Sequence, residues 1–100
     1  MIMKIEIRSK NLKINDVAKQ KTESYLYNLQ NKFPKFINVD SNAHIDISEY
    51  DETRGEHVRI TLDTQKIGIF RSEAKGEELF KTIDEATKKL ESQIKRKSKK

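Results

Sequence analysis

The C-terminal quarter of the chain, residues 77–100, carries the pattern that most constrains the fold. Apolar residues recur there at steps of four, three, four and four residues: Leu79, Ile83, Ala86, Leu90 and Ile94. This spacing places them on one stripe of an α-helix. Glu77 and Glu78 begin the predicted helix and basic residues end it, an order of charge that the helix dipole favours. Because the stripe is apolar, the rest of the chain must supply a surface for it to cover.

Alternation of apolar and polar residues predicts four β-strands. The apolar positions of the first three are Met3, Ile5 and Ile7, then Ala43, Ile45 and Ile47, then Val58, Ile60 and Leu62. Residues 67–72 form the predicted fourth strand, whose facing stays open because Ile67 and Ile69 compete with Phe70 for the buried side. Such one-sided alternation leaves only one face of the sheet to be covered.

A second amphipathic helix is expected between the first two strands. Its stripe consists of Ala18, Thr22, Leu26, Leu29 and Phe33, with Val17 and Tyr25 beside it. Asn15 or Asp16 can cap its start, and Pro34 ends it at or just before Phe33. The predicted connections are a turn at 9–12, a segment at 36–42, an acidic hairpin tip at 49–55, a tight turn at 63–66 and a loop around 75–76.

The predicted element order is therefore β-α-β-β-β-α. Short turns between the last three strands argue for antiparallel pairing there. Two amphipathic helices suffice to cover one face of a four-stranded sheet, so the expected architecture is an α+β two-layer sandwich. One hundred residues make one domain. We expect it to span residues 1–97, followed by a basic disordered tail at 98–100.

Several protein classes are excluded by composition. The chain has no cysteine, which excludes disulfides, thiolate metal sites and a cysteine nucleophile and is consistent with a reducing compartment. No apolar run approaches the length of a membrane span. The N-terminus alternates apolar and charged residues, so it does not resemble a signal peptide. A cytoplasmic location is the prediction.

Charge is concentrated at one end of the chain. Lysine and arginine number 21 against 16 acidic residues, for a net charge of +5. Residues 92–100 hold five basic residues and no acidic one, and the remaining chain is balanced. A solvated helix face is the simpler explanation. The clustering instead indicates that this end binds a polyanion, because each cation placed at a phosphate releases counterions. Nucleic acid is the first candidate and an anionic membrane the second.

No pattern in the sequence indicates an enzyme. The serines lie in no nucleophile motif, and a glycine-rich phosphate loop is absent. His44 and His57 occupy outward strand positions where they could be neighbours across the sheet, but zinc needs at least three protein ligands. Glu49, Asp51 and Glu52 lack the spacing of a calcium loop. We therefore predict no enzymatic activity, no metal and no cofactor. Tyr27 and Tyr50 are the candidates for stacking on bases.

Two segments resemble a known family. Residues 78–85, ELFKTIDE, with 89–94, KLESQI, resemble the second helix of the ribosome hibernation-promoting factor and ribosome-associated inhibitor A family. Residues 14–19, INDVAK, are similar to the opening of its first helix. Phe80 and Thr82 depart mildly from the usual tyrosine and alanine, and Ser72 replaces a small apolar residue. The resemblance covers nearly the whole chain and implies the same element order, similar to a double-stranded RNA-binding domain with an added strand.

The resemblance also implies a function. Family members bind the small ribosomal subunit where mRNA and the A- and P-site tRNAs would sit, and so block translation in idle ribosomes during stress or stationary phase. The implied partner is ribosomal RNA, in competition with mRNA and tRNA, and the resemblance allows for a partner factor that dimerises ribosomes. This chain looks like a short member, or the N-terminal domain of a long one. No membrane partner is expected.

Basic residues on the two helices are the implied RNA contacts. Matched to the motifs of the family, they are Lys19, Lys89, Gln93, Arg96 and Lys100. The neighbouring basic residues complete the predicted set with Lys21, Lys88, Lys95 and Lys99. One alternative is a generic double-stranded RNA-binding module, although acidic residues stand where its last helix would begin with a basic cluster. The other is a protein-interaction domain with a solvated basic tail.

Overall fold

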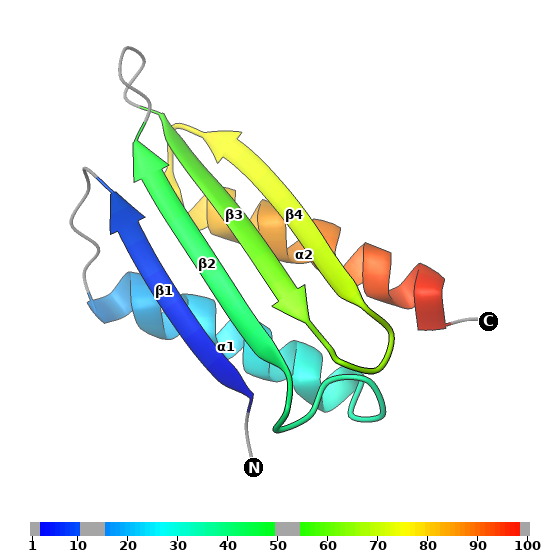
Figure 1. The fold of residues 1–100 in the computed structure, drawn as a ribbon. Helices are drawn as coiled ribbons and strands as arrows, with labels where there is room; N and C mark the ends of the chain where they lie inside the picture. The colour runs from blue at the N-terminus through cyan, green and yellow to red at the C-terminus, as the bar shows by residue number, and fades with distance from the viewer. Residues whose placement is uncertain (1–2, 11–15, 50–54, 99–100) are drawn as a thin grey trace.

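A computed structural model describes residues 3–10, 16–49 and 55–98. The element order is the predicted one: β1 (Lys4–Lys10), α1 (Asp16–Lys32), β2 (Asn42–Glu49), β3 (Glu56–Asp63), β4 (Ile69–Gly76) and α2 (Leu79–Ser98). Both helices lie on one face of the sheet and the other face is open (Figure 1). The predicted two-layer α+β sandwich is therefore confirmed. Neither helix in the described part of the chain is apolar enough over a sufficient length to cross a bilayer.

The sheet is mixed. Its strands lie in the order β1-β2-β3-β4, with β1 parallel to β2 and the other neighbours antiparallel. The parallel pair follows from the helical crossover, because α1 carries the chain back before β2 begins. The antiparallel pairs have the short connections predicted for them. As a result, β1 and β4 are the two edge strands.

The core forms where the predicted stripes meet. The inward residues of β2 and β3 and the stripe residues of α2 from Ile83 to Ile94 are fully buried, and Ala18, Leu26 and Leu29 of α1 join them. Leu79 and Phe33, at the two helix ends, are only partly buried. Val17 is 62% exposed, so its expected place beside the stripe is wrong. It lies in the first turn of α1, where it points away from the sheet.

The connection into β4 decides which face of that strand is buried. Thr64 donates its hydroxyl to the Gly68 carbonyl at 2.8 Å and accepts the Ile67 N–H at 3.0 Å, so the turn spans 64–68 and not 63–66. Gly68 has a φ of +103°, which an L-residue rarely adopts. The longer turn brings Phe70 into the core and leaves Ile69 59% exposed. Ile67 packs against the core from the turn itself.

Other boundaries differ from those predicted. β1 continues through Ser9 and Lys10, where a turn was expected, and β4 includes Lys75 and Gly76, where a loop was expected. α2 begins at Leu79, because the carbonyl of Glu78 accepts the first N–H, from Thr82 at 3.0 Å. It extends through Ser98. Glu49 belongs to β2 and Gly55 directly precedes β3, whereas residues 50–54 of the acidic tip, including Tyr50, and the candidate cap Asn15 lie outside the described residues.

Candidate nucleic-acid interface

The open face of the sheet carries both histidines, but they are not neighbours. In the register of β2 and β3, His44 is opposite Thr61 and His57 is opposite Ser48. Each lies near a carboxylate instead: His44 is 3.4 Å from Glu6, and His57 is 3.5 Å from Glu73. The prediction that the two histidines are neighbours is therefore wrong. Alternation along each strand predicted that both point outward, but it could not predict the register of β2 on β3. In the described ranges no three metal-binding side chains come together.

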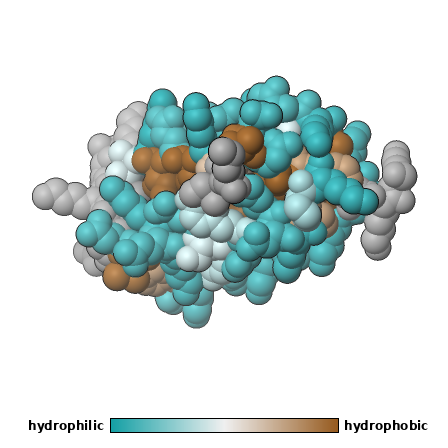
Figure 2. Space-filling view, turned by 90° about the horizontal axis from the view of Figure 1, so that it is seen from below, coloured by the Kyte–Doolittle hydropathy of each residue, from teal (hydrophilic) through white to brown (hydrophobic). Residues whose placement is uncertain are grey.

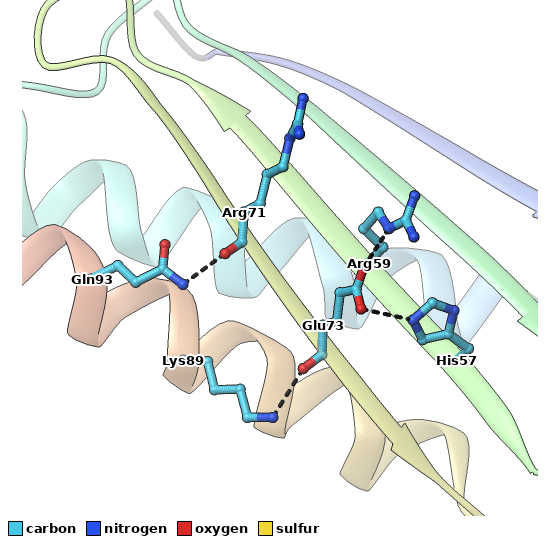
Figure 3. Close-up of polar contacts among 6 residues, drawn as sticks. All are labelled: His57, Arg59, Arg71, Glu73, Lys89 and Gln93. Atoms are coloured by element: carbon cyan, nitrogen blue, oxygen red, sulfur yellow. Dashed lines mark hydrogen bonds and ion pairs between the residues drawn. The ribbon is translucent and has the colours of Figure 1, made fainter.

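Opposite charges alternate across this open face. Arg8, Asp46, Arg59 and Glu73 share one cross-strand row. Across the β3–β4 pair, Arg59 Nε contacts Glu73 Oε1 at 2.7 Å (Figure 3). Within β1, Arg8 Nε contacts Glu6 Oε1 at 2.8 Å. Cross-strand pairs of opposite charge stabilise a sheet modestly and cancel much of its local potential. The open face is thus polar without being a concentrated basic surface.

Glu73 makes this face sensitive to acid. The hydrogen bond from Arg59 lowers the pKa of the Glu73 carboxyl below its ordinary value of 4.5. A carboxyl whose pKa is lower in the folded state stabilises the protein above its unfolded pKa, and that contribution is lost as the pH falls through the folded value.

We therefore expect Glu73→Gln to lower the free energy of unfolding at neutral pH and to have no effect well below pH 4.5. Urea denaturation of both proteins at the two pH values measures this difference. An equal loss of stability at both would contradict the prediction, because it would show that Glu73 acts by packing and not through its charge.

The outer edge of β4 is covered by two side chains of α2. Lys89 Nζ donates to the carbonyl of Glu73 at 3.0 Å, and Gln93 Nε2 donates to the carbonyl of Arg71 at 2.6 Å (Figure 3). These carbonyls would otherwise face outward as unpaired edge groups. Two of the predicted RNA contacts therefore have a structural role in the free protein. Their contact with RNA stays a prediction.

Lysines gather on the opposite flank of α2, where it meets α1. Lys88 contacts Asp84 at 3.1 Å, Lys95 contacts Glu91 at 3.1 Å, and Lys32 of α1 contacts the same Glu91 at 3.2 Å. Lys21 of α1 lies 5.0 Å from the centre of the Phe80 ring. We call this line of four lysines, Lys21, Lys32, Lys88 and Lys95, the helix seam. Three of these lysines, Lys21, Lys88 and Lys95, are predicted RNA contacts, whereas Lys32 was not among the predicted residues.

The spacing of residues in α1 could have predicted that Lys32 lies on the same flank as Lys21. Lys21, Tyr25, Asn28 and Lys32 follow one another at steps of four, three and four residues, so they lie on one flank of α1. Lys19 is only two residues from Lys21 and therefore points about 200° away around the helix. The structure consequently does not bring Lys19 to the seam. Lys99 and Lys100 lie outside the described residues.

The C-terminal end of α2 presents two basic side chains, those of Arg96 and Lys97, without an acidic partner in the described part of the chain. The helix is 20 residues long and its last turns extend past the sheet (Figure 1). Arg96 and Lys97 are exposed there, and within the described ranges neither contacts a carboxylate. Together with Phe70 and Gln93 they line a shallow hollow of about 390 Å³. Hydrophilic residues also cover most of the end of the molecule seen in Figure 2, with apolar residues in small groups among them.

Comparisons with known proteins agree with this architecture. The family model described as "Sigma 54 modulation protein / S30EA ribosomal protein" matches residues 5–100. A relative from Bacillus subtilis (strain 168), named ribosome hibernation promotion factor, is 28% identical over 94 residues. That match covers 94% of this chain and 48% of the relative, so the chain spans about half the length of the curated relative.

Two solved structures share the fold. The N-terminal domain of Protein Y from Thermus thermophilus has a TM-score of 0.77 at 26% identity, with 94% of this chain and 98% of that chain covered. A ribosomal subunit interface protein from Coxiella burnetii has a TM-score of 0.83 at 21% identity, with 98% and 100% covered. At 21% identity, the similarity to the Coxiella burnetii protein is evidence of a shared fold only.

Proposed function

This chain belongs to the sigma 54 modulation protein / S30EA ribosomal protein family, and on that premise we propose that it silences idle ribosomes. The family is one of ribosome-associated proteins and not of enzymes. In the proposed mechanism the protein occupies the channel of the small subunit that otherwise holds mRNA and the A- and P-site tRNAs. It acts in the cytoplasm under stress or in stationary phase, and it inhibits translation by blocking that channel.

The observation that carries this proposal is the pair of exposed cations Arg96 and Lys97 at the end of α2, which contact no carboxylate among the described residues. Among the described residues, Arg96 and Lys97 have no ion pair that must break before they bind phosphates, and the helix seam continues the basic surface toward α1. Phosphate contacts of this kind set affinity and orientation, whereas the shape of folded RNA selects the site. A surface that recognises shape suits a channel built mainly of folded RNA.

A generic double-stranded RNA-binding module is the competing function. Such a module would need a basic cluster where α2 begins, and here Glu77 and Glu78 precede the helix. Lys81, the basic residue in the first turn of α2, pairs with Glu78 at 3.5 Å and so already has an acidic partner. This end of α2 is therefore poorly suited to entering an RNA groove.

Co-sedimentation with isolated small subunits tests the proposal. We expect saturable binding that mRNA and tRNA together abolish, because all three ligands would occupy one channel. A plain RNA duplex in equal excess is the control competitor, and it should displace little protein. Binding that ignores mRNA and tRNA but yields to the duplex would overturn the proposal in favour of the generic module.

The length of the curated relative extends the proposal to a partner. That relative is about twice as long as the matched region, so about half of it has no counterpart in the residues matched here. We propose that ribosome dimerisation, where it occurs, depends on a factor or domain other than the residues described here. This domain would supply only the attachment to the small subunit.

A further inference from the structure

A groove lined by polar residues lies between α1 and α2, and two lysines of the helix seam, Lys32 and Lys88, are among them. Its volume is about 440 Å³. Two pairs of residues connect the helices beside it: Tyr25 lies near Asp84, and Lys32 contacts Glu91 at 3.2 Å. The bridging residues are seven apart on each helix, which corresponds to about 10 Å. The groove therefore lies between two points at which α1 and α2 approach each other.

The groove is closer to neutral than the surface around it. Asp84 is paired with Lys88, and Glu91 with both Lys32 and Lys95. A phosphate inside the groove would lie near two carboxylates and be repelled by them, so the attraction of the surrounding lysines would be largely cancelled. An uncharged ring carrying hydrogen-bonding groups meets no such repulsion.

Two carboxamides line the same groove. Asn28 and Asn31 are exposed on α1, and in the described part of the structure their side chains make no hydrogen bond. Each amide offers donors and an acceptor side by side. Thr87, also in the groove, already donates its hydroxyl to the carbonyl of Ile83 at 2.8 Å. The two asparagines are therefore the groups of the groove that are free to recognise a ligand.

We propose that this groove receives one unpaired base of the bound RNA. Asn28 and Asn31 hydrogen-bond the edge of that base, and the flanking phosphates lie on the lysines of the helix seam. Proteins recognise single-stranded RNA by the exposed edges of unstacked bases. A side-chain amide matches the adjacent donor and acceptor of adenine best, so adenine is the preferred base. This inference rests on the proposed function and names what the helix face recognises.

The test compares Asn28→Ala/Asn31→Ala with the control Gln20→Ala, which removes an exposed carboxamide of α1 outside the groove. Alanine favours the helix at each position, so both proteins should fold. We expect the double variant to bind small subunits about tenfold more weakly, the cost of losing one base contact. Its salt dependence should be unchanged and the control should bind normally. Equal binding by double variant and control would overturn the inference.

A second measurement separates this inference from the proposed function. Titration of the protein with single-stranded RNA octamers of each base should shift the NMR signals of the Asn28 and Asn31 side-chain amides, most strongly with adenine, and leave those of Gln20 in place. Shifts in this experiment would support the groove even if ribosomes did not bind. If ribosomes bind while no octamer shifts these signals, the groove inference fails and the proposed function stands.

Discussion

Small ribosomal subunits should bind a variant carrying Arg96→Gln and Lys97→Gln much more weakly than the unaltered chain, and with a weaker dependence on salt. Both side chains are exposed beyond the sheet and, among the described residues, neither is engaged by a carboxylate. Losing two phosphate contacts lowers the slope of log affinity against log salt by about 2. The advantage of the unaltered chain should then be on the order of tenfold larger at about 50 mM than at about 200 mM salt.

A matched control removes the same charge from the other face of the molecule. Lys4→Gln with Arg71→Gln also replaces one lysine and one arginine, both exposed on the open face of the sheet and without an ion-pair partner in the described ranges. We expect this control to retain most of the affinity and the salt slope. If the two variants lost affinity equally, binding would follow net charge and not the end of α2, and the interface assigned here would be wrong.

Replacing Leu90 by alanine should lower the free energy of unfolding by about 3 kcal/mol, within the range for buried leucines. Leu90 is 0% exposed in the middle of α2, which packs against β3 and β4. The substitution removes its contacts and leaves a cavity that a sheet and a helix cannot easily close. Since domains of this size are only about 5–15 kcal/mol stable, the loss is a large share of the total.

Leu79→Ala is the matched control for that core substitution. Leu79 belongs to the same predicted stripe but is only partly buried in the first turn of α2. Urea denaturation followed by circular dichroism should show a clearly smaller loss for it, because less of its surface leaves water on folding. Equal losses at the two positions would contradict the central place given to Leu90 in the core.

The element order and the core were readable from the sequence because they depend on periodicity. The α2 stripe and the alternation of β2 and β3 name the buried residues directly, and the structure places Ile45, Ile60 and Leu90 where the pattern requires. The concentration of positive charge at the C-terminus is likewise a property of the chain itself. The family motifs in the second helix are short runs of neighbouring residues, so they too could be recognised without the structure.

Contacts between segments could not be read in this way. The register of β2 on β3 separates His44 from His57, and a turn containing Gly68 decides that Phe70 and not Ile69 enters the core. Likewise, only the docking of α2 beside β4 brings Gln93 to the carbonyl of Arg71.

The helix seam and its groove also depend partly on local sequence and partly on tertiary structure. The sequence alone determined which residues share a flank of each helix, because helical spacing repeats every few residues. The tertiary structure decided that Lys32 meets Glu91, 59 positions later, and that Tyr25 meets Asp84. Such pairings depend on how far apart and at what rotation two helices settle on the sheet. That arrangement is set by the packing of the whole core, and no local pattern of residues encodes it.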